Sequence, residues 1–381
     1  MVKANAYGHG DIEVTRALRS AGAEQVGVGL IEEGMGLRLS GDTGKILLFG
    51  LFEERSADAV LEFELTPVLS SWEQIGSLER AAENAIQKRN QRAQPTESVA
   101  PLNRIPVHIK FNTGMNRLGF DVYDASTLRT RIESSKYLQL EGICTHLLRG
   151  DDAGAEGGES ESQFTLFAEA AQAFEGMKIH VHALNSSGAA NLWKRVSEKK
   201  RLTAGVSWPL GARPGLSTYG IQPSNDENVL LNLQPVLSLK SQVVMLHRLD
   251  VGERVSYNAT WRAQRTSLIG VVPAGYADGV FRSLTNKGRV LVRGEYAPMI
   301  GTVCMDYFMI DLTDIEAMVS QRGDVPIARG EEVVLIGDQS GANGMKSISA
   351  SDIASIVGTI PYEILTHIGE RVPRVYIRSE A

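Results

Sequence analysis

The sequence predicts an α/β protein, in which a (β/α)8 barrel of the TIM type is followed by a mostly-β C-terminal domain. Two observations lead to this prediction. Over residues 1–225, short apolar runs alternate with helical stretches, which is the pattern of a parallel sheet whose strands are joined by helices. After about residue 228 the long helical stretches stop, and strand-like runs follow turn signals. We therefore expect two domains, residues 1–228 and residues 229–381.

Apolar runs predict the strands of the barrel. Five of them are "VGVGLI", "KILLFG", "PVHIKF", "LQLEGICTH" and "KIHVHALN", at residues 26–31, 45–50, 106–111, 138–146 and 178–185. A strand at the start of the chain and another near "AGVSW" (204–208) bring the number close to the eight strands of a closed barrel. No GxGxxG follows a strand, which disfavours an open dinucleotide-binding sheet.

The intervening stretches have helical periodicity. "DIEVTRALRSAG" predicts a helix with Asp11 as its N-cap and an end near Gly22, because Val14, Leu18 and Ala21 share one face. Residues 71–90 and 162–176 predict two more helices. The polar, proline-containing segment 90–104 predicts a surface insertion.

The predicted C-terminal domain contains six strand-like runs and one helix. The helix is "SASDIASIVG" (349–358). The strand-like runs are residues 236–250, 267–276, 289–294, 296–312, 331–337 and 371–378.

Composition excludes several classes of protein. The net charge is -6 with acids and bases interspersed, which gives no reason to expect a nucleic-acid or membrane partner. No apolar run is long enough to span a bilayer, and residues 1–10 lack the apolar core of a signal peptide. The two cysteines, Cys144 and Cys304, lie in apolar strand-like contexts, so we expect a reducing cytoplasm and no disulfide framework. Neither CxxC nor HExxH occurs, so no catalytic metal is expected.

Polar side chains and glycines gather at the predicted carboxyl ends of the strands, where barrel enzymes place their sites. They are Lys110, Arg117, His146, Asn185, Ser186, Arg213, Gly215 and Tyr219. The Ser-Ser-Gly that opens a helix at Ser186 offers hydroxyl and N–H groups to an anion, and Gly215 lets the backbone approach a phosphate. The residues alone therefore predict an anion-binding barrel enzyme.

A series of motifs makes this prediction more specific. In chain order they are "VKANAYGHG", "KFNTGMNRLGF", "LNSSGAA", "RPGLSTYG", "VSYNATW", "GYADG", "GTVCMD" and "GTIPYEI". Together they resemble the motifs of bacterial alanine racemases over essentially the whole chain. The resemblance implies a barrel that binds pyridoxal 5'-phosphate (PLP), a C-terminal β domain, and the interconversion of L- and D-alanine that supplies peptidoglycan synthesis.

The resemblance also implies two catalytic residues. Lys3 corresponds to the lysine that attaches PLP and serves as one acid/base group, and Tyr257 to the tyrosine that serves the opposite face of Cα. In this family the tyrosine comes from the other subunit, so the resemblance implies a homodimer with shared active sites.

Further roles follow from the same resemblance. Arg213 corresponds to the arginine that faces the pyridine nitrogen, and His146 to a histidine linked to it. The residues that match the phosphate-binding part of the site are Tyr7, Ser186, Gly215, Leu216 and Tyr362. The residues that match the substrate-carboxylate side are Arg117, Met305 and Asp306, and Lys110 matches a lysine that is often carbamylated.

The chain departs from the family pattern at three places. Asn112 and Asn116 replace an aspartate and a glycine, and "LLRGDD" follows His146 where small residues and acids are usual. Family members carry a β-domain strand, a helix and most of the first barrel strand before the lysine, whereas two residues precede Lys3 here. We therefore expect a truncated first strand. The alternatives are a serine or broader-specificity racemase, a decarboxylase on the same fold, a non-catalytic PLP-binding protein, and a truncated inactive form.

Overall fold

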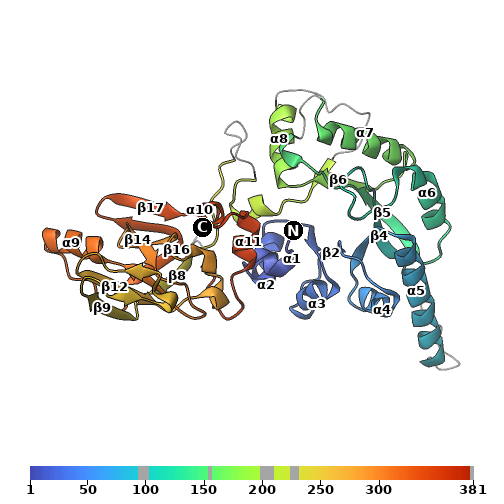
Figure 1. Ribbon diagram of the computed structural model, residues 1–381. Helices are drawn as coiled ribbons and strands as arrows, with labels where there is room; N and C mark the ends of the chain where they lie inside the picture. The colour runs from blue at the N-terminus through green and yellow to red at the C-terminus, as the bar shows by residue number, and fades with distance from the viewer. Residues whose placement is uncertain (93–102, 153–156, 198–209, 224–230, 378–381) are drawn as a thin grey trace. The chain divides into compact units, whose positions relative to one another are not determined.

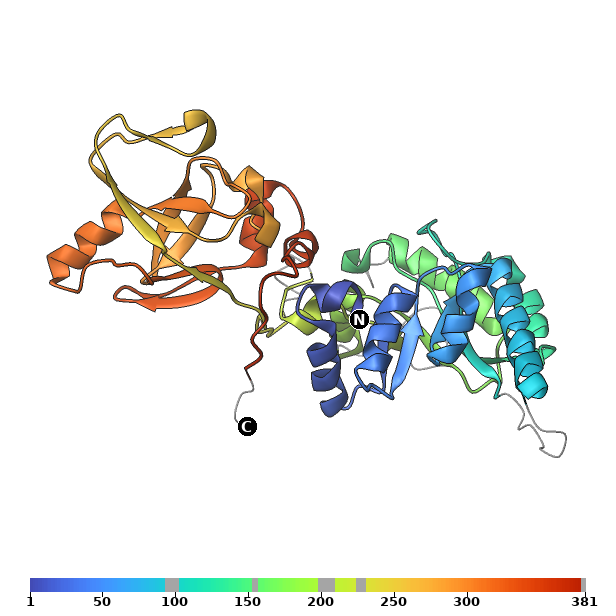
Figure 2. The same cartoon turned by 90° about the horizontal axis from the view of Figure 1, so that it is seen from below.

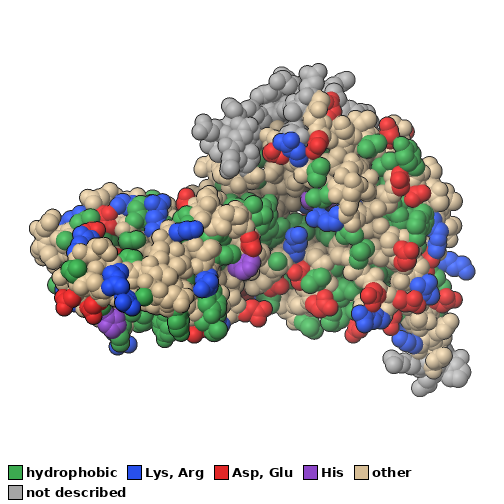
Figure 3. Space-filling model, in the orientation of Figure 1, with side chains coloured by type: hydrophobic (Ala, Val, Ile, Leu, Met, Phe, Trp, Pro, Cys, Tyr) green, Lys and Arg blue, Asp and Glu red, His purple; other side chains and the backbone are tan. Residues whose placement is uncertain are grey.

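The computed structural model describes residues 1–92, 103–152, 157–197, 210–223 and 231–377. The chain forms two units. One contains Met1–Ala6 and Gly10–Gln234, and the other contains Tyr7–His9 and Pro235–Ala381. The predicted domain boundary at residues 228 and 229 lies outside the described residues. Figure 3 shows acidic and basic side chains interspersed over the visible face of both units.

A parallel sheet forms the first unit. Its order is β1-β2-β3-β4-β5-β6-β7, so each strand pairs with the next one along the chain. The strands are β1 (Gln25–Val28), β2 (Lys45–Leu48), β3 (Thr66–Leu69), β4 (Ile105–Lys110), β5 (Leu138–Cys144), β6 (His180–Leu184) and β7 (Leu210–Ala212). Figures 1 and 2 show helices around the outside of these strands. This sequential order confirms the predicted barrel-type architecture.

Met1 and Val2 occupy the place of the predicted first strand. The Val2 N–H donates to the Gly27 carbonyl of β1 over 2.8 Å, and the Met1 nitrogen donates to the Pro214 carbonyl over 3.0 Å. The Tyr219 hydroxyl also donates to the Met1 carbonyl over 2.7 Å. These two residues therefore connect β1 with the segment that follows β7.

The helices of the first unit alternate with its strands. They are α1 (Lys3–Tyr7, whose last residue belongs to the other unit), α2 (Asp11–Ser20), α3 (Ile31–Leu39), α4 (Glu54–Glu62), α5 (Trp72–Arg92), α6 (Ala125–Glu133), α7 (Glu159–Gln172) and α8 (Ser186–Ser197). The prediction that Asp11 caps α2 was wrong. Gly10 is the N-cap, and Asp11 is the first helical residue, whose carboxylate accepts from the Ile12 N–H over 2.8 Å.

Strand β3, "TPVL", was not predicted, because it has only four residues and contains Pro67, which weakens a strand pattern. The predicted strand at 204–208 lies outside the described residues, and β7 begins two residues later. Most of the predicted insertion, residues 93–102, also lies outside them.

An antiparallel sheet dominates the second unit, in the order β17-β16-β13-β14-β15-β12-β9, with β8 paired to β16 and a separate β10-β11 pair. The strands are β8 (Leu239–Gln242), β9 (Met245–Leu249), β10 (Arg254–Val255), β11 (Trp261–Arg262), β12 (Ser267–Val272), β13 (Arg289–Val292), β14 (Glu295–Ile300), β15 (Phe308–Asp311), β16 (Glu332–Gly341) and β17 (Gly344–Ile348). This confirms the mostly-β prediction.

Helices flank this second sheet. They are α9 (Thr313–Arg322), α10 (Ala350–Val357) and α11 (Pro361–Thr366), whereas only α10 was predicted. Residues 371–377 of the last predicted strand form no strand. Val290, Ala297, Phe308, Ile310 and Val333 belong to one buried core. Among the described residues, no helix combines the length and apolarity needed to cross a membrane.

Candidate active site

Lys3 begins a turn of unusual handedness. Ala4, Asn5, Ala6 and Tyr7 all have positive φ angles, of 52°, 52°, 52° and 54°. A left-handed turn of non-glycine residues costs about 1–2 kcal/mol per residue. Surrounding contacts must therefore hold this conformation, as is common at functional sites.

Backbone hydrogen bonds hold much of this turn. The Ala6 N–H donates to the Val2 carbonyl, and the Gly10 N–H donates to the Asn5 carbonyl, both over 2.9 Å. The Asn5 side-chain oxygen accepts from the Asp11 N–H over 3.0 Å. The Lys3 residue itself is exposed, so the strained turn presents its side chain to the surroundings.

Arg213, which follows β7, is surrounded by neutral acceptors. It donates to Nδ1 of His182 over 2.6 Å, to Nδ1 of His146 over 3.2 Å and to the Thr145 carbonyl over 2.6 Å. Its guanidinium also lies 5.7 Å from the centre of the Phe49 ring. No carboxylate forms an ion pair with Arg213 within the described part of the chain. Because Arg213 is a half-buried cation with only neutral partners, it favours the binding of a ligand group with a lone pair or a negative charge.

The two histidines beside Arg213 are neutral at ordinary pH. Burial, reinforced by the positive charge of Arg213, lowers the pKa of His146 to about 3 and the pKa of His182 well below its usual value. A guanidinium can only donate, so Nδ1 of each ring must be unprotonated and accept. The two imidazoles therefore fix the guanidinium without adding charge.

Ser186 joins two of the predicted motifs. It is the first residue of α8, and its Oγ accepts from the Gly215 N–H over 2.9 Å and lies 3.1 Å from the Ser217 hydroxyl. Leu216 follows Gly215 in the chain and is buried. It is the first residue of the short helix η3 (Leu216–Tyr219). The structure thus brings Ser186, Gly215 and Leu216 together at the positive end of a helix.

Lys110 ends β4 and is buried, with only 8% of its surface exposed. Burial lowers the pKa of its ammonium group, and the positive charges of Arg117, Arg213 and Lys3 lower it further, while the Cys144 thiol opposes them. Lys110 thus lies close enough to Lys3, Arg117 and Arg213 for their charges to act on it.

The loop that carries Arg117 is stabilised by the two asparagines that depart from the family pattern. The Asn112 side-chain oxygen accepts from the Asn116 N–H over 2.9 Å, and the two side chains also hydrogen-bond over 2.9 Å. Asn116 has a φ of 53°, a conformation that favours glycine and tolerates asparagine. Asn116 can therefore replace the glycine of the family pattern.

Tyr7 and Tyr362 lie together in the second unit. Their ring centres are 5.9 Å apart, and Tyr362 belongs to α11. Burial raises the pKa of Tyr7 to about 12 and also raises the pKa of Tyr362. Both phenols therefore remain protonated at neutral pH.

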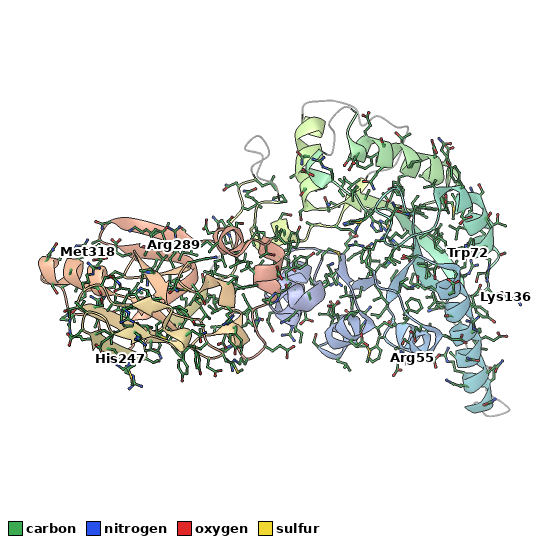
Figure 4. All side chains as sticks on the ribbon, viewed as in Figure 1. Arg55, Trp72, Lys136, His247, Arg289 and Met318 are labelled. Carbon is green, nitrogen blue, oxygen red and sulfur yellow. The ribbon has the colours of Figure 1, made fainter. Side chains whose placement is uncertain are left out.

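Tyr257 stands on an exposed loop of the second unit. It begins η5 (Tyr257–Ala259), is 71% exposed, and accepts at its carbonyl from the Thr302 hydroxyl over 2.9 Å. It lines an open hollow of about 460 Å³ together with Arg254, Cys304 and His247. Figure 4 labels His247 at the edge of this unit.

Met305 and Asp306 belong to the same region of the second unit. The Ser256 hydroxyl donates to the Thr302 carbonyl over 2.7 Å, which joins the loop before Tyr257 to the one that leads to Met305. Asp306 forms an ion pair with Arg371 over 2.8 Å. The predicted site residues therefore form two groups, one in each unit.

Sequence reasoning missed two contributors: His182, which accepts from Arg213, and Glu33, whose carboxylate accepts from the Ala4 N–H directly after Lys3. His180 and His182 are two residues apart in "KIHVHALN", so both point to the same face of the predicted strand, and a pair of histidines on one face was a signal that pointed to His182. Glu33 carries no comparable local signal.

Comparisons with known proteins match both parts of the chain to one family. The family described as "Alanine racemase, N-terminal domain" matches residues 1–223, and "Alanine racemase, C-terminal domain" matches residues 236–376. The alanine racemase of Geobacter sulfurreducens is 35% identical over 99% of this chain and 89% of its own length. The alanine racemase of Clostridium novyi is 34% identical over 100% of this chain and 88% of its own length.

Solved structures give the same result. The alanine racemase structure from Bacillus anthracis with bound L-Ala-P has a TM-score of 0.78 at 30% identity, covering 100% of this chain and 88% of that one. The alanine racemase structure from Bartonella henselae with covalently bound pyridoxal phosphate has a TM-score of 0.75 at 28% identity. The match covers 99% of this chain and 91% of that one.

Proposed function

The chain belongs to the alanine racemase family, and from that premise we propose that it interconverts L- and D-alanine with PLP as its cofactor. The observation that carries the proposal is the convergence of basic side chains at one end of the sheet: Lys110 ends β4, Arg213 follows β7, and the positive charges of Lys3, Arg117 and Arg213 all act on Lys110 and on His146. Such a site suits an anionic cofactor and a substrate carboxylate. An exposed lysine at this place provides the amine that binds the cofactor aldehyde.

The residues present fit PLP. Its phosphate requires hydroxyl and N–H donors near positive charge, and Ser186, Ser217 and the first turn of α8 offer them. We assign Gly215, Leu216, Tyr7 and Tyr362 to the same phosphate. Its pyridine nitrogen requires a donor, and Arg213 offers one. When bound, PLP withdraws the electron pair that remains on Cα after a proton leaves.

Racemisation requires proton transfer on both faces of Cα. We assign one face to Lys3 and the other to Tyr257, because an amine and a phenol are the acid/base groups that the family motifs place there. Tyr257 would come from a second copy of the chain, so we also propose a homodimer with shared sites.

Arg213 restricts the chemistry of the site. Its guanidinium keeps its own protons, so it would hold the pyridine nitrogen by a hydrogen bond without protonating it. This limits electron withdrawal from Cα and favours proton exchange over transamination and decarboxylation. His146 and His182 support the role because they accept from Arg213 and leave it charged.

The substrate carboxylate is assigned to Arg117 and to Met305 and Asp306 of the second copy. Lys110 is buried, and burial together with the charges of Arg117, Arg213 and Lys3 lowers its pKa, which favours a neutral amine. Such an amine can add to carbon dioxide and release a proton to solvent, which leaves a carbamate. A carbamate there would give Arg117 a negative partner.

We place the enzyme in the cytoplasm, where D-alanine is needed as a precursor of peptidoglycan. The two cysteines support this placement because both are free: Cys144 is buried and Cys304 is half-buried. A reducing compartment keeps such thiols unpaired.

The test is racemisation by the purified chain with added PLP, with L-alanine and L-serine compared as substrates. We expect D-alanine to form faster than D-serine, borohydride to fix PLP on Lys3, and Tyr257→Phe to remove most of the activity. A PLP adduct on another lysine would overturn the assignment of Lys3, and faster turnover of serine would establish the alternative substrate.

A further inference from the structure

Glu33 makes three hydrogen bonds to backbone N–H groups near Lys3. Its Oε1 accepts from Ala4 over 2.6 Å, and its Oε2 accepts from Gly29 over 2.7 Å and from Leu30 over 3.1 Å. Glu33 lies in the first turn of α3 and is half-buried. No ion pair of Glu33 occurs among the residues that the structure describes, so its carboxylate serves these backbone groups.

These three bonds connect two separate segments. Gly29 and Leu30 follow β1, whereas Ala4 is the residue directly after Lys3 and the first of the left-handed turn. Hydrogen bonds to a carboxylate are worth about twice as much as neutral ones. Glu33 therefore contributes to holding a conformation that is unfavourable by itself.

The side chain of Lys3 runs past the same place. A Cβ atom added to Gly29 would lie 3.6 Å from Lys3 Cβ, 3.7 Å from Lys3 Cδ and 3.5 Å from Glu33 Oε2. The aliphatic part of Lys3 thus passes over Gly29, and the Glu33 carboxylate lies over the same glycine. Glu33 therefore holds the backbone on which the Lys3 side chain lies.

We propose that Glu33 is a positioning residue, which fixes the backbone after Lys3 to the end of β1 and so sets the direction of the lysine amine. The inference rests on the proposed function only in that Lys3 is the residue that receives PLP. Glu33 acts through Lys3 and takes no part in proton transfer.

The test compares Glu33→Gln with Glu32→Gln. Glutamine keeps the shape of Glu33 but has one oxygen, so it cannot accept from Ala4 and from Gly29 at the same time. Glu32 is exposed in the same helical turn, so its replacement makes the same change of charge without touching Lys3. Both variants are compared with the wild-type chain.

Two readouts are used. The first is amide hydrogen exchange of residues 3–10 without PLP, and the second is the Kd of PLP from its visible absorbance, with borohydride mapping of the adduct. For Glu33→Gln we expect exchange at Ala4 and the Kd to rise by about 10- to 100-fold, the range for a lost hydrogen bond to a charged group. For Glu32→Gln we expect changes within about twofold, as for an exposed site.

Each outcome decides the proposal. Equal exchange and equal Kd in the two variants would overturn it, as would a rise in exchange along the whole chain, which indicates general destabilisation. If the wild-type adduct maps to another lysine, the proposed function is wrong in its assignment of Lys3, whereas the exchange at Ala4 separately decides whether Glu33 holds the turn.

Discussion

Arg213 donates a hydrogen bond of 2.6 Å to Nδ1 of His182, and this contact sets the protonation of a longer chain of imidazoles. Because His182 accepts at Nδ1, its proton is on Nε2, which lies 2.8 Å from Nδ1 of His108. His108 must then carry its own proton on Nε2, and this buried atom has no hydrogen-bond partner among the described residues. The network therefore ends in an unsatisfied donor, and it is stable only while all its histidines are neutral.

This arrangement predicts a loss of stability in acid. Burial, with the nearby charges of His180, Lys45 and Arg213, lowers the pKa of His108 to about 3, whereas the unfolded chain has the ordinary value near 6.5. Between these values the unfolded state binds a proton that the folded state does not. The free energy of unfolding should therefore fall with falling pH, by up to about 1.4 kcal/mol per pH unit for this histidine.

Urea unfolding between pH 7 and pH 4 measures this effect. We expect a shallower pH dependence for His108→Asn than for the wild-type chain, because asparagine does not titrate. His247→Asn is the matched control, since His247 is exposed. An unchanged slope in His108→Asn would contradict the prediction.

The contacts of Arg371 predict that this residue affects substrate binding. It forms a two-point contact with Asp278, over 2.7 and 3.0 Å, and a third bond to Asp306 over 2.8 Å. The loop that contains Asp278 is also hydrogen-bonded to Met305, because the Ala277 N–H donates to the Met305 carbonyl over 3.1 Å. Loss of Arg371 should release Met305 and Asp306 together.

For Arg371→Ala we expect KM for alanine to rise several-fold with a smaller change in kcat, because the altered residues belong to the carboxylate side of the proposed site. Steady-state kinetics checks this. Arg265→Ala removes a comparable exposed ion pair with Asp314 and should leave both constants unchanged. Equal effects of the two variants would refute a specific role for Arg371.

The sequence predicted the parts of the site that are encoded locally. Ser186 opens a helix and Gly215 precedes another, the short helix η3, and both features are visible in a few neighbouring residues. The contact between His108 and His182 is different. These residues lie on β4 and β6, and Gly142 of β5 pairs with His108 between them. A side chain on Gly142 would collide with the His108 ring, so the contact depends on strand register and on a distant glycine.

The turn after Lys3 could not be predicted for another reason. Alanine and tyrosine disfavour a left-handed conformation, and a run of four such residues is unfavourable even where asparagine is one of them, so local preference opposes the structure that forms. Contacts from outside the segment, including Glu33, overcome that preference. Residues 7–9 even belong to the second unit, although both flanking segments belong to the first.

Two glycines near Lys3 should respond differently to alanine. A Cβ on Gly50 would collide with the backbone carbonyl of Gly29, whereas a Cβ on Gly29 would have ordinary contacts of 3.5 Å or more. We expect Gly50→Ala to lower the free energy of unfolding by about 1–3 kcal/mol, as for overpacking, and Gly29→Ala to change it much less. Chemical denaturation of both variants measures the difference, and equal losses would show that the ends of β1 and β2 adjust freely.

The start of α10 predicts a stability effect that is separate from activity. The Ser349 hydroxyl accepts from the Asp352 N–H over 3.0 Å, and the Asp352 carboxylate accepts from the Ser349 N–H over 2.8 Å. This reciprocal pair satisfies two N–H groups that the helix leaves unpaired. Ser349→Ala removes one of them and should lower the free energy of unfolding by about 1 kcal/mol.

Denaturation of Ser349→Ala, together with its PLP Kd and kinetic constants, separates the two properties. Ser351→Ala is the control, because Ser351 is exposed one residue inside the same helix and does not cap it. We expect only Ser349→Ala to lose stability, and neither variant to change PLP binding. A weaker PLP Kd in Ser349→Ala would show that the stability of α10 is coupled to the cofactor site, against this prediction.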